Sequence, residues 1–406
     1  MGIQRQRGDA MNQQHAWGAN YTPRKGWFHS WANLDLGSVD NDFATLADLG
    51  LDHVRIFPLW PLLQPNRTFI DSKAIDDVLA VADAAGDAGL TVSVDLLQGH
   101  LSSFDFLPSW VSTWHRRNIF TDADVVNGQR ALARALAAEL SARPHVSGLT
   151  LGNEIGQFAA PRHPERHEIS PSEAYAWLDG MLAEVRGAFP TGAHHHCFDD
   201  DTWFVDAHPF TPRAAVELGD STTVHSWIFG GAAQRYGIDA PELPHFARYL
   251  LEVADLWHRV SGQPSDRPVW LQEVGAPTPW VSPENAADFL EGTVRAACGY
   301  RDLSGITWWC SHDVSRTLAD FPDLEYSLGL IDSEGAVKPA GERLRDLIAL
   351  EKAGELATTP TSTQSVIVEG LKADGSNRSL TNTGSDVFGE WMDFARRGEY
   401  RSLELG

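Results

Sequence analysis

The sequence has little cysteine and no long apolar run, and both shortages restrict the class of protein. Its three cysteines, Cys197, Cys298 and Cys310, are far apart and surrounded by apolar residues. This spacing argues against a disulfide framework or a zinc knuckle and predicts reduced core residues. The first residues, "MGIQRQRGDAMNQQHAWG", lack the apolar centre of a signal peptide, and no later stretch is long enough to span a bilayer. We therefore expect a soluble cytoplasmic protein.

Positive charge is also scarce. The chain carries 32 basic and 55 acidic side chains, a net charge of -23. A surface of this sign repels phosphate backbones and anionic lipid headgroups. We therefore expect no nucleic acid and no membrane among the partners, and a neutral or cationic ligand instead.

What the sequence does contain, from about Trp17 to about Leu350, is a regular alternation of short apolar runs with longer helix-forming segments. The runs are rich in Val, Ile and Trp and are apolar on both faces, which is typical of parallel strands covered on both sides. Eight such runs alternating with helices predict an α/β fold, the (β/α)8 or TIM barrel. They occupy residues 17–22, 52–60, 90–99, 148–154, 193–200, 221–227, 267–275 and 305–313.

The same alternation would also suit a doubly wound sheet, but no Gly-x-Gly-x-x-Gly turn follows an early strand. We therefore assign residues 1–350 to a catalytic barrel. Residues 351–406 have a different composition, first rich in Thr and Ser and then β-prone, with room for a short helix near the end. This C-terminal extension is too short for an independent domain. It could lean on the barrel, pair with a neighbouring subunit or be partly disordered.

Polar residues at the carboxyl ends of the strands are the candidates for a site, because chemistry in TIM barrels collects there. The second run delivers Arg55, and the third delivers Gln98 or His100. The fourth run, "GLTLGNE", ends in an amide directly beside a carboxylate instead of in ordinary turn residues. The candidates from the fourth to the eighth run are Asn153, Glu154, His225, Trp227, Glu273, Trp308 or Trp309, His312 and Asp313.

Two of these residues, Glu154 and Glu273, should face each other across the barrel mouth. Opposed carboxylates are the minimum apparatus for glycoside hydrolysis, in which one protonates the departing oxygen while the other attacks the anomeric carbon or activates water. The amide of Asn153 could hydrogen-bond the sugar 2-hydroxyl. Arg55 would lower the pKa of the nucleophile, whereas Glu154 needs a drier site that keeps it protonated.

Each candidate also has a structural interpretation. Asn153 and Glu154 could cap a helix, and Glu273 could pair with a buried arginine. Arg55 could hold strands together as an ion pair, which coincides with the functional role if its partner is Glu273. The three histidines at 194–196 cannot converge on one metal ion, because successive strand residues point to opposite faces. We expect neither a metal nor a cofactor.

The fourth-strand Asn-Glu pair, the seventh-strand Glu and the eighth-strand Trp resemble clan A glycoside hydrolases, and Arg55 narrows the resemblance to glycoside hydrolase family 5. Over roughly residues 17–350 the chain is most similar to the bacterial subfamily 18 β-mannosidases, which release mannose from the Man-β-1,4-GlcNAc core of N-glycans. The segment "YSLGLIDSEGAVKPAGERL" (326–344) is also similar to the one that follows strand eight in many clan A exo-enzymes.

The resemblance implies that Glu154 is the acid/base and Glu273 the nucleophile of a retaining double displacement through a covalent glycosyl-enzyme. It places Trp308 beneath the reacting sugar as a platform, and the adjacent Trp309 would then point to the opposite face. Family 5 commonly has a Tyr where this chain has Trp227, so the contribution of a Tyr hydroxyl must come from elsewhere. The substrate-binding residues implied are Arg55, His100, Asn153, His225, Trp227 and Trp308.

The leading hypothesis is an exo-acting β-mannosidase that removes the terminal β-mannosyl residue from a small neutral oligosaccharide such as Man-β-1,4-GlcNAc. A cytoplasmic location favours exo action, since a polymer-degrading enzyme would need secretion. An endo-β-mannanase, a β-glucosidase or a β-galactosidase would use the same carboxylate pair, and a non-enzymatic carbohydrate-binding barrel is the alternative from a different class. The loops around 100–127 and 200–215 contain Trp and Phe and could pack on a second copy of the chain, as in a homo-oligomer.

Overall fold

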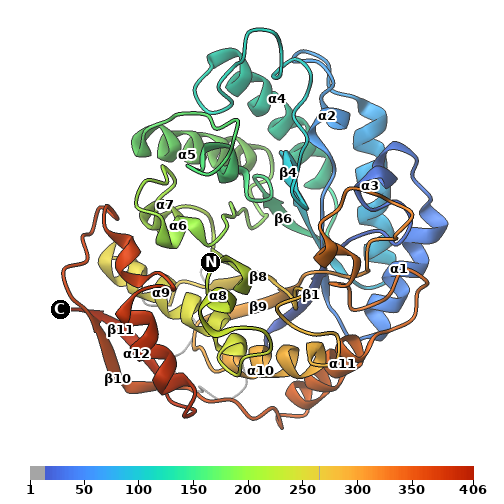
Figure 1. Ribbon diagram of the computed structural model, residues 1–406. Coiled ribbons are helices and arrows are strands. Elements are labelled where there is room, and N and C mark those ends of the chain that lie inside the picture. Colours follow the sequence, from blue (N-terminus) through green and yellow to red (C-terminus); the bar gives the residue numbers. More distant parts are fainter. Residues whose placement is uncertain (1–13, 265) are drawn as a thin grey trace, which may run out of the picture.

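The computed structural model describes residues 14–264 and 266–406, and its centre is a barrel of parallel strands surrounded by helices (Figure 1). Seven strands are hydrogen-bonded side by side in the order β6-β3-β2-β1-β9-β8-β7, and every pair is parallel. Each overlaps one of the predicted apolar runs, and the TIM-barrel fold is confirmed. The strands are β1 (Ala16–Asn20), β2 (His53–Ile56), β3 (Thr91–Asp95), β6 (Val146–Thr150), β7 (Thr222–Ser226), β8 (Val269–Val274) and β9 (Leu303–Trp308).

The fifth predicted run, residues 193–200, fills the gap between β6 and β7 but is not a regular strand. Its backbone pairs with β6, with the N–H of His195 donating to Leu149 at 2.8 Å. Close pairing requires Gly148, where a Cβ atom would lie 1.6 Å from the Ala193 carbonyl oxygen. On the β7 side a side chain makes a connection, the Thr223 hydroxyl donating to the His196 carbonyl at 2.7 Å. The fifth position of the barrel is therefore occupied by an irregular segment, residues 193–200, here called the fifth stave.

Long helices cover the outside of the barrel, and several begin at caps that the sequence supplies. Asp71 and Asp122 accept from the first turns of α3 and α4, and Ser170 forms a capping box with Glu173 at the start of α5. No helix in the described part of the chain is long and apolar enough to cross a membrane. The outer helices are α1 (Leu36–Asp48), α3 (Ser72–Asp87), α4 (Ala123–Leu140), α5 (Pro171–Ala188), α7 (Pro212–Glu217), α9 (Phe246–Val260), α10 (Ala286–Cys298) and α11 (Pro339–Lys352).

Shorter elements lie in the loops that follow the strands and shape the mouth of the barrel. One is a small hairpin, β4 (His100–Leu101) with β5 (Phe104–Asp105). The others are short helices and 3-10 turns: α2 (Trp60–Leu63), α6 (Asp201–Phe204), α8 (Ala232–Tyr236), η1 (Trp27–Ala32), η2 (Ile155–Ala159), η3 (Ile228–Gly230), η4 (Leu243–His245) and η5 (Asp323–Tyr326).

The C-terminal extension folds into a small unit that packs against α9 (Figure 1, red). Two parallel strands, β10 (Thr361–Val368) and β11 (Tyr400–Leu405), are joined through η6 (Arg378–Thr381) and α12 (Asp386–Ala395). The buried Arg248 of α9 ties it down by donating to the Thr361 hydroxyl at 2.6 Å. A second tie runs from Arg378 of η6 to the Val205 carbonyl at 2.7 Å. The described residues of this extension therefore lean on the barrel, which is one of the three arrangements that the sequence left open.

Candidate active site

The two predicted glutamates meet at the carboxyl ends of β6 and β8. Glu154 follows β6, and Glu273 is the last residue but one of β8. Carboxyl oxygens of both residues and a ring nitrogen of His225 lie within 4.8 Å of one another. All three side chains are buried. The centre of the site is therefore a pair of opposed carboxylates with an imidazole between them.

Arg55 joins the nucleophile candidate to the neighbouring strands. Its fully buried guanidinium donates to Glu273 at 2.8 Å and to Asn153 at 2.8 Å. Two further bonds of 2.8 Å reach both oxygens of Asp95 at the end of β3, a planar bidentate pair. The structural and the functional interpretations of Arg55 thus coincide. Asp95 was not predicted, although its position at the end of a buried strand was a signal for it.

The backbone around Glu154 is shaped to point its side chain into the site. Gly152 has a φ of 155°, and a Cβ atom there would lie 2.4 Å from the Leu97 carbonyl oxygen. Glu154 itself adopts left-handed φ and ψ of 42° and 36°, which an ordinary L-residue adopts at a cost. It precedes η2, but its side chain makes no capping hydrogen bond. The helix-cap interpretation of the Asn-Glu pair therefore fails for Glu154.

His225 links the two carboxylates. Its Nδ1 lies 2.8 Å from Oε1 of Glu154 and 3.3 Å from Oε2 of Glu273, while its Nε2 lies 3.1 Å from the amide oxygen of Gln272. An amide oxygen only accepts, so Nε2 carries a proton. Nδ1 then either donates to the carboxylates or accepts the proton of Glu154. The Glu154–His225 contact therefore holds one exchangeable proton.

Burial and His225 set the ionisation of the unliganded site. Burial acts to raise the pKa of Glu154, but the hydrogen bond and charge of His225 outweigh it and hold that pKa below the ordinary value. For Glu273, burial and the nearby Glu154 raise the pKa despite His225 and Arg55. Burial lowers the pKa of His225, but Glu273 and Glu154 bring it well above 6.5. This is the reverse of the expectation from sequence, which could not show that the imidazole bonds to Glu154.

Trp227 supplies the donor that a Tyr would provide at this position in family 5. Its indole Nε1–H donates to Oε2 of Glu273 at 3.3 Å. The sequence-based expectation that this contribution must come from elsewhere is therefore corrected: the same position provides it through a different side chain.

The tryptophan that lines the pocket is Trp309 and not Trp308. The Trp308 side chain is 1% exposed and belongs to the main hydrophobic core. Trp309 lines the pocket, with its ring 6.3 Å from that of Trp227. Neighbouring strand residues face opposite ways, as the sequence indicated, but the assignment of the two faces was wrong.

The two candidates from the third predicted run, Gln98 and His100, have different surroundings. Gln98 is fully buried and its amide oxygen accepts from the Asn153 backbone at 3.3 Å. His100 lies in the β4–β5 hairpin, lines the pocket and contacts Asp105 at 2.9 Å. His100 is therefore the residue that a ligand can reach.

One pocket of about 430 Å³ lies at the barrel mouth and is lined by His100, Asn153, Glu154, Trp227, Glu273 and Trp309. The predicted substrate-binding residues Arg55 and His225 are fully buried behind it and do not line it. Several polar lining residues were not among the candidates: Ser102, Ser103, Gln157, Arg162, Asp199, Asp200 and Glu325. Asp199 and Asp200 end the predicted fifth run, a strand-end signal that was available, whereas the others lie outside the predicted strands.

Arg162 and Gln157 both donate to Asp199 at 2.6 Å. Burial raises the pKa of Asp200 to about 7, with Asp201 adding to it. The pocket is concave, buried and rich in directed polar groups, as a sugar site must be.

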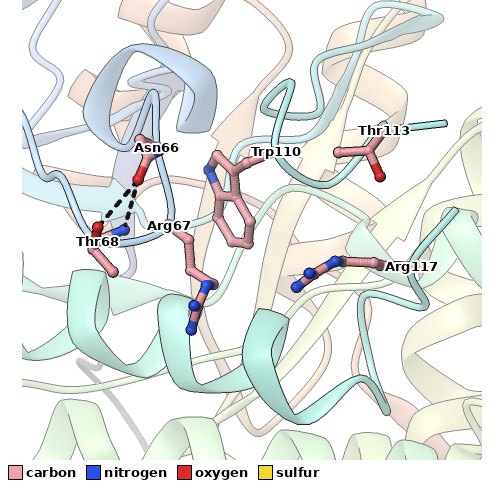
Figure 2. Close-up of a pocket in the computed structure, with 6 residues that line it drawn as sticks. All are labelled: Asn66, Arg67, Thr68, Trp110, Thr113 and Arg117. Atoms are coloured by element: carbon pink, nitrogen blue, oxygen red, sulfur yellow. Dashed lines mark hydrogen bonds between the residues drawn. The ribbon is translucent and has the colours of Figure 1, made fainter. Parts of the chain in front are cut away.

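A second hollow of about 300 Å³ lies between the loop after α2 and the segment before α4 (Figure 2). Arg67 and Arg117 lie beside the indole of Trp110 there, and both pair with Asp124, at 3.1 and 3.4 Å. None of the residues lining it is acidic, so it lacks the pair of carboxylates found in the first pocket.

The histidines at 194–196 have separate partners. His194 contacts the Phe189 carbonyl, His195 the Ser221 hydroxyl and His196 the Leu218 carbonyl. They support the irregular fifth stave and do not converge. In the catalytic pocket, the guanidinium of Arg55 already supplies a positive charge to Glu273 at 2.8 Å.

A TIM barrel with two buried, opposed carboxylates at the carboxyl ends of β6 and β8 defines a glycoside hydrolase. No family model matches the chain, and no curated protein matches its sequence. Solved structures do match. The chain belongs to glycoside hydrolase family 5, subfamily 18.

Two of these relatives are glutamate-to-alanine variants in complex with Man-β-1,4-GlcNAc. The one from Streptomyces cattleya is 46% identical, with a TM-score of 0.92 over 97% of this chain and 94% of that chain. The one from Bifidobacterium longum subsp. longum is 43% identical, with a TM-score of 0.91 over 97% and 91%. The exo-beta-1,4-mannosidase Op5Man5 from Opitutaceae bacterium strain TAV5, at 20% identity, a TM-score of 0.76 and coverage of 98% and 72%, shares the fold.

Proposed function

We propose that this glycosidase is a retaining exo-β-mannosidase that releases the terminal mannosyl residue of a small oligosaccharide such as Man-β-1,4-GlcNAc. The observation that carries the proposal is the meeting of Glu154 and Glu273, with oxygens within 4.8 Å, in a deep pocket. The relatives that hold Man-β-1,4-GlcNAc, at 43% and 46% identity, support the choice of sugar.

The short separation of the carboxylates supports retention of configuration. Retaining enzymes hold the two carboxyl groups about 5 to 5.5 Å apart, whereas inverting enzymes leave about 6.5 to 9.5 Å for a water molecule. Glu273 is the nucleophile of the proposal, because Arg55 and Trp227 hold its carboxylate in place with directed donors. Glu154 is the acid/base, and the proton that it shares with His225 is the one delivered to the leaving oxygen.

Loops at one end of the pocket support exo action. Four rings from η1, the β4–β5 hairpin and the loop after β9 pack together: Phe28, Phe104, Phe106 and Phe321, here called the aromatic wall. The Phe28 ring lies 5.4, 4.7 and 5.2 Å from those of Phe104, Phe106 and Phe321. Ser102, Pro322 and Leu324 of the same loops line the pocket. In the proposal, this packed wall closes the pocket beyond the terminal sugar.

The opposite end of the pocket suits the leaving sugar. Glu154 interacts by charge with Arg162 and with three aspartates, Asp199, Asp200 and Asp201. Gln157, Arg162 and Asp199 offer amide, guanidinium and carboxyl groups there. Such groups are the partners that hydroxyls and an acetamido group require. A GlcNAc leaving group therefore fits this end.

The test compares Glu273→Gln, Glu154→Gln and the exposed control Glu168→Gln on Man-β-1,4-GlcNAc and on nitrophenyl β-mannoside. Glu273→Gln should lower kcat by several orders of magnitude on both substrates while sugar binding stays measurable. Glu154→Gln should lose far more on the disaccharide, because nitrophenolate leaves without being protonated. Glu168 is exposed, so its variant should match the wild type.

Three results would contradict the proposal. Unchanged hydrolysis by Glu273→Gln would remove the nucleophile assignment, and an α-configured first product would remove retention. Activity only on long mannan chains would favour an endo-β-mannanase. A preference for the nitrophenyl glucoside or galactoside would favour a β-glucosidase or a β-galactosidase, and binding without turnover would favour a carbohydrate-binding barrel.

Two further sequence-based predictions accompany the proposal, a cytoplasmic location and a homo-oligomer. Trp114, 97% exposed in the loop before α4, is a side chain that a subunit interface would cover. Light scattering of the purified chain tests the oligomer, and cell fractionation tests the location.

A further inference from the structure

A buried carboxyl group outside the catalytic pair faces the pocket. Glu325 lies in η5, is 5% exposed and lines the pocket together with Glu273. Its Oε2 is buried and has no hydrogen-bond partner among the described residues. A buried polar atom without a partner costs free energy unless a ligand satisfies it. The Nε1–H of Trp309, which also lines the pocket, is buried and without a partner in the same way.

The backbone of Glu325 holds η5 in place, since its N–H donates to the Pro322 carbonyl at 3.0 Å and its carbonyl accepts from Val314 at 3.1 Å. Burial raises the pKa of the side chain to about 7; the neighbouring donors of Ser102 and Trp309 lower this pKa, and the charge of Glu273 adds to the rise. A carboxyl group kept at this cost near the nucleophile is typical of a site where function opposes stability.

Glu325 lies at the end of the pocket that takes the terminal sugar. Trp309 lines the pocket together with Glu325; its ring lies 6.3 Å from that of Trp227, and Trp227 donates to Glu273. Glu154 is followed by η2, whose Gln157 shares the Asp199 carboxylate with Arg162. Glu325 therefore groups with Glu273, and Arg162 groups with Glu154. A sugar with its anomeric carbon at Glu273 and its glycosidic oxygen at Glu154 directs the opposite edge of its ring toward Glu325.

We propose that Glu325 is a specificity-determining residue that hydrogen-bonds a hydroxyl group of the terminal sugar at the ring edge remote from the anomeric carbon. This inference rests on the proposed function. A hydroxyl group both donates and accepts, so one such group can satisfy the Glu325 carboxyl and the Trp309 N–H together. The hydroxyls on carbons 3, 4 and 6 of the sugar are at that edge. The 2-hydroxyl is next to the anomeric carbon and lies on the Asn153 side.

The experiment is a cycle of variants and substrates. The kcat/KM values of wild type and Glu325→Gln are measured on nitrophenyl β-mannoside and on three analogues that each lack one of these hydroxyls. The control is Asp323→Asn, which changes the same charge on the same turn, at an exposed side chain. Wild type should lose roughly 10- to 100-fold on the analogue that lacks the contacted hydroxyl. On the parent sugar, the kcat/KM of Glu325→Gln should be lower than that of wild type by a similar factor. On the analogue that lacks the contacted hydroxyl, the kcat/KM of this variant should fall little further.

Two results would overturn the inference. One is a Glu325→Gln variant with wild-type kcat/KM. The other is an equal further loss on all three analogues, which would mean that Glu325 contacts none of the hydroxyls. The melting temperature distinguishes a substrate-binding role from a structural one. If Glu325 binds substrate, Glu325→Gln should melt at or above the wild-type temperature. A lower melting temperature combined with equal losses would make Glu325 a structural residue.

Failure of the proposed function has a different signature. In that case the wild type would turn over a nitrophenyl glucoside or galactoside and not the mannoside. The same cycle is then run on the analogues of the sugar that it does cleave, and Glu325 is judged on those.

Discussion

A single imidazole sets the ionisation of the active site. His225 reaches both carboxylates through Nδ1, at 2.8 and 3.3 Å, and is oriented by Gln272 through Nε2. Each carboxyl group of the pair therefore titrates as part of a three-group unit and not alone. In the proposed mechanism, this unit holds the proton for the leaving group before substrate arrives.

The hydrogen bond that Trp227 donates to Glu273 can be tested by substitution. Trp227→Phe removes a hydrogen bond to a carboxylate, so the pKa of Glu273, already raised above 4.5, should rise further. A nucleophile must be ionised, and the acidic limb of the kcat/KM profile should therefore shift to higher pH. We expect kcat to fall roughly 10-fold.

Trp227→Tyr is the matched control, because its hydroxyl can restore a donor at the same position. It should return the acidic limb toward the wild-type pH. Identical pH profiles for Phe and wild type would show that the 3.3 Å contact does not influence Glu273.

The sequence could predict which residues meet, but not every direction in which they point. Strand count brought Arg55, Asn153, Glu154 and Glu273 together, because the ends of parallel strands share one edge of the barrel. The choice between Trp308 and Trp309 depended on the parity of one strand, which two adjacent tryptophans do not reveal. Asp199 and Asp200, at the end of the predicted fifth run, could have been found by the same rule. Loop residues of the pocket such as Ser102 and Glu325 could not be predicted, because tertiary contacts and not local patterns set loop conformations.

At the scale of elements, the extension depends on one buried ion pair in α9. Arg248 donates to Glu252 at 2.9 Å, to the Ala296 carbonyl at 2.8 Å and to Thr361 of β10 at 2.6 Å. Both charged side chains are almost fully buried. The pair thus connects α9, α10 and the extension within one network.

Arg248→Met should be strongly destabilising, because it leaves the Glu252 carboxylate buried without its partner. We expect a loss of about 3–5 kcal/mol in the free energy of unfolding, measured by denaturant titration. The double variant Arg248→Met with Glu252→Leu should recover most of that loss, since neither charge is then left alone. A single variant within about 1 kcal/mol of wild type would contradict the role assigned to this pair.

The fifth stave shows why an apolar run need not become a strand. Residues 193–200 have the composition of a barrel strand, and their backbone does pair with β6. Toward β7, however, the hydroxyl groups of Ser221 and Thr223 contact His195 and the His196 carbonyl. Sequence periodicity predicts where the fifth stave lies. It does not predict that side-chain hydrogen bonds replace backbone hydrogen bonds on the side toward β7.

For the whole molecule, histidines determine the response to acid. Eight share one property: burial lowers their pKa below the ordinary 6.5. They are His167, His194, His195, His196, His208, His245, His258 and His312. In the unfolded chain they bind protons near pH 6.5, whereas in the folded chain the pKa of seven of them lies at about 3 or 4 and that of His194 is lowered. Their contribution to stability is complete above pH 6.5 and is lost as the pH falls toward these values.

The melting temperature should therefore fall steadily as the pH is lowered from about 6.5 to about 4.5. Carboxyl groups whose pKa is raised by burial, among them Asp199, Asp200 and Glu325, act in the opposite direction and reduce the slope. His196→Gln should flatten the slope, and the exposed His115→Gln should leave it unchanged. A melting temperature that is constant over this range would contradict the argument.

The aromatic wall has a consequence for the order of events in a turnover. In the proposed mechanism this wall closes one end of the pocket, so that substrate enters and products leave on the side of Arg162. The leaving sugar then has to move away before water can reach the proposed glycosyl-enzyme, and mannose leaves last. An alcohol that binds there ahead of water would take the mannosyl group instead, so the proposed enzyme should also catalyse transfer.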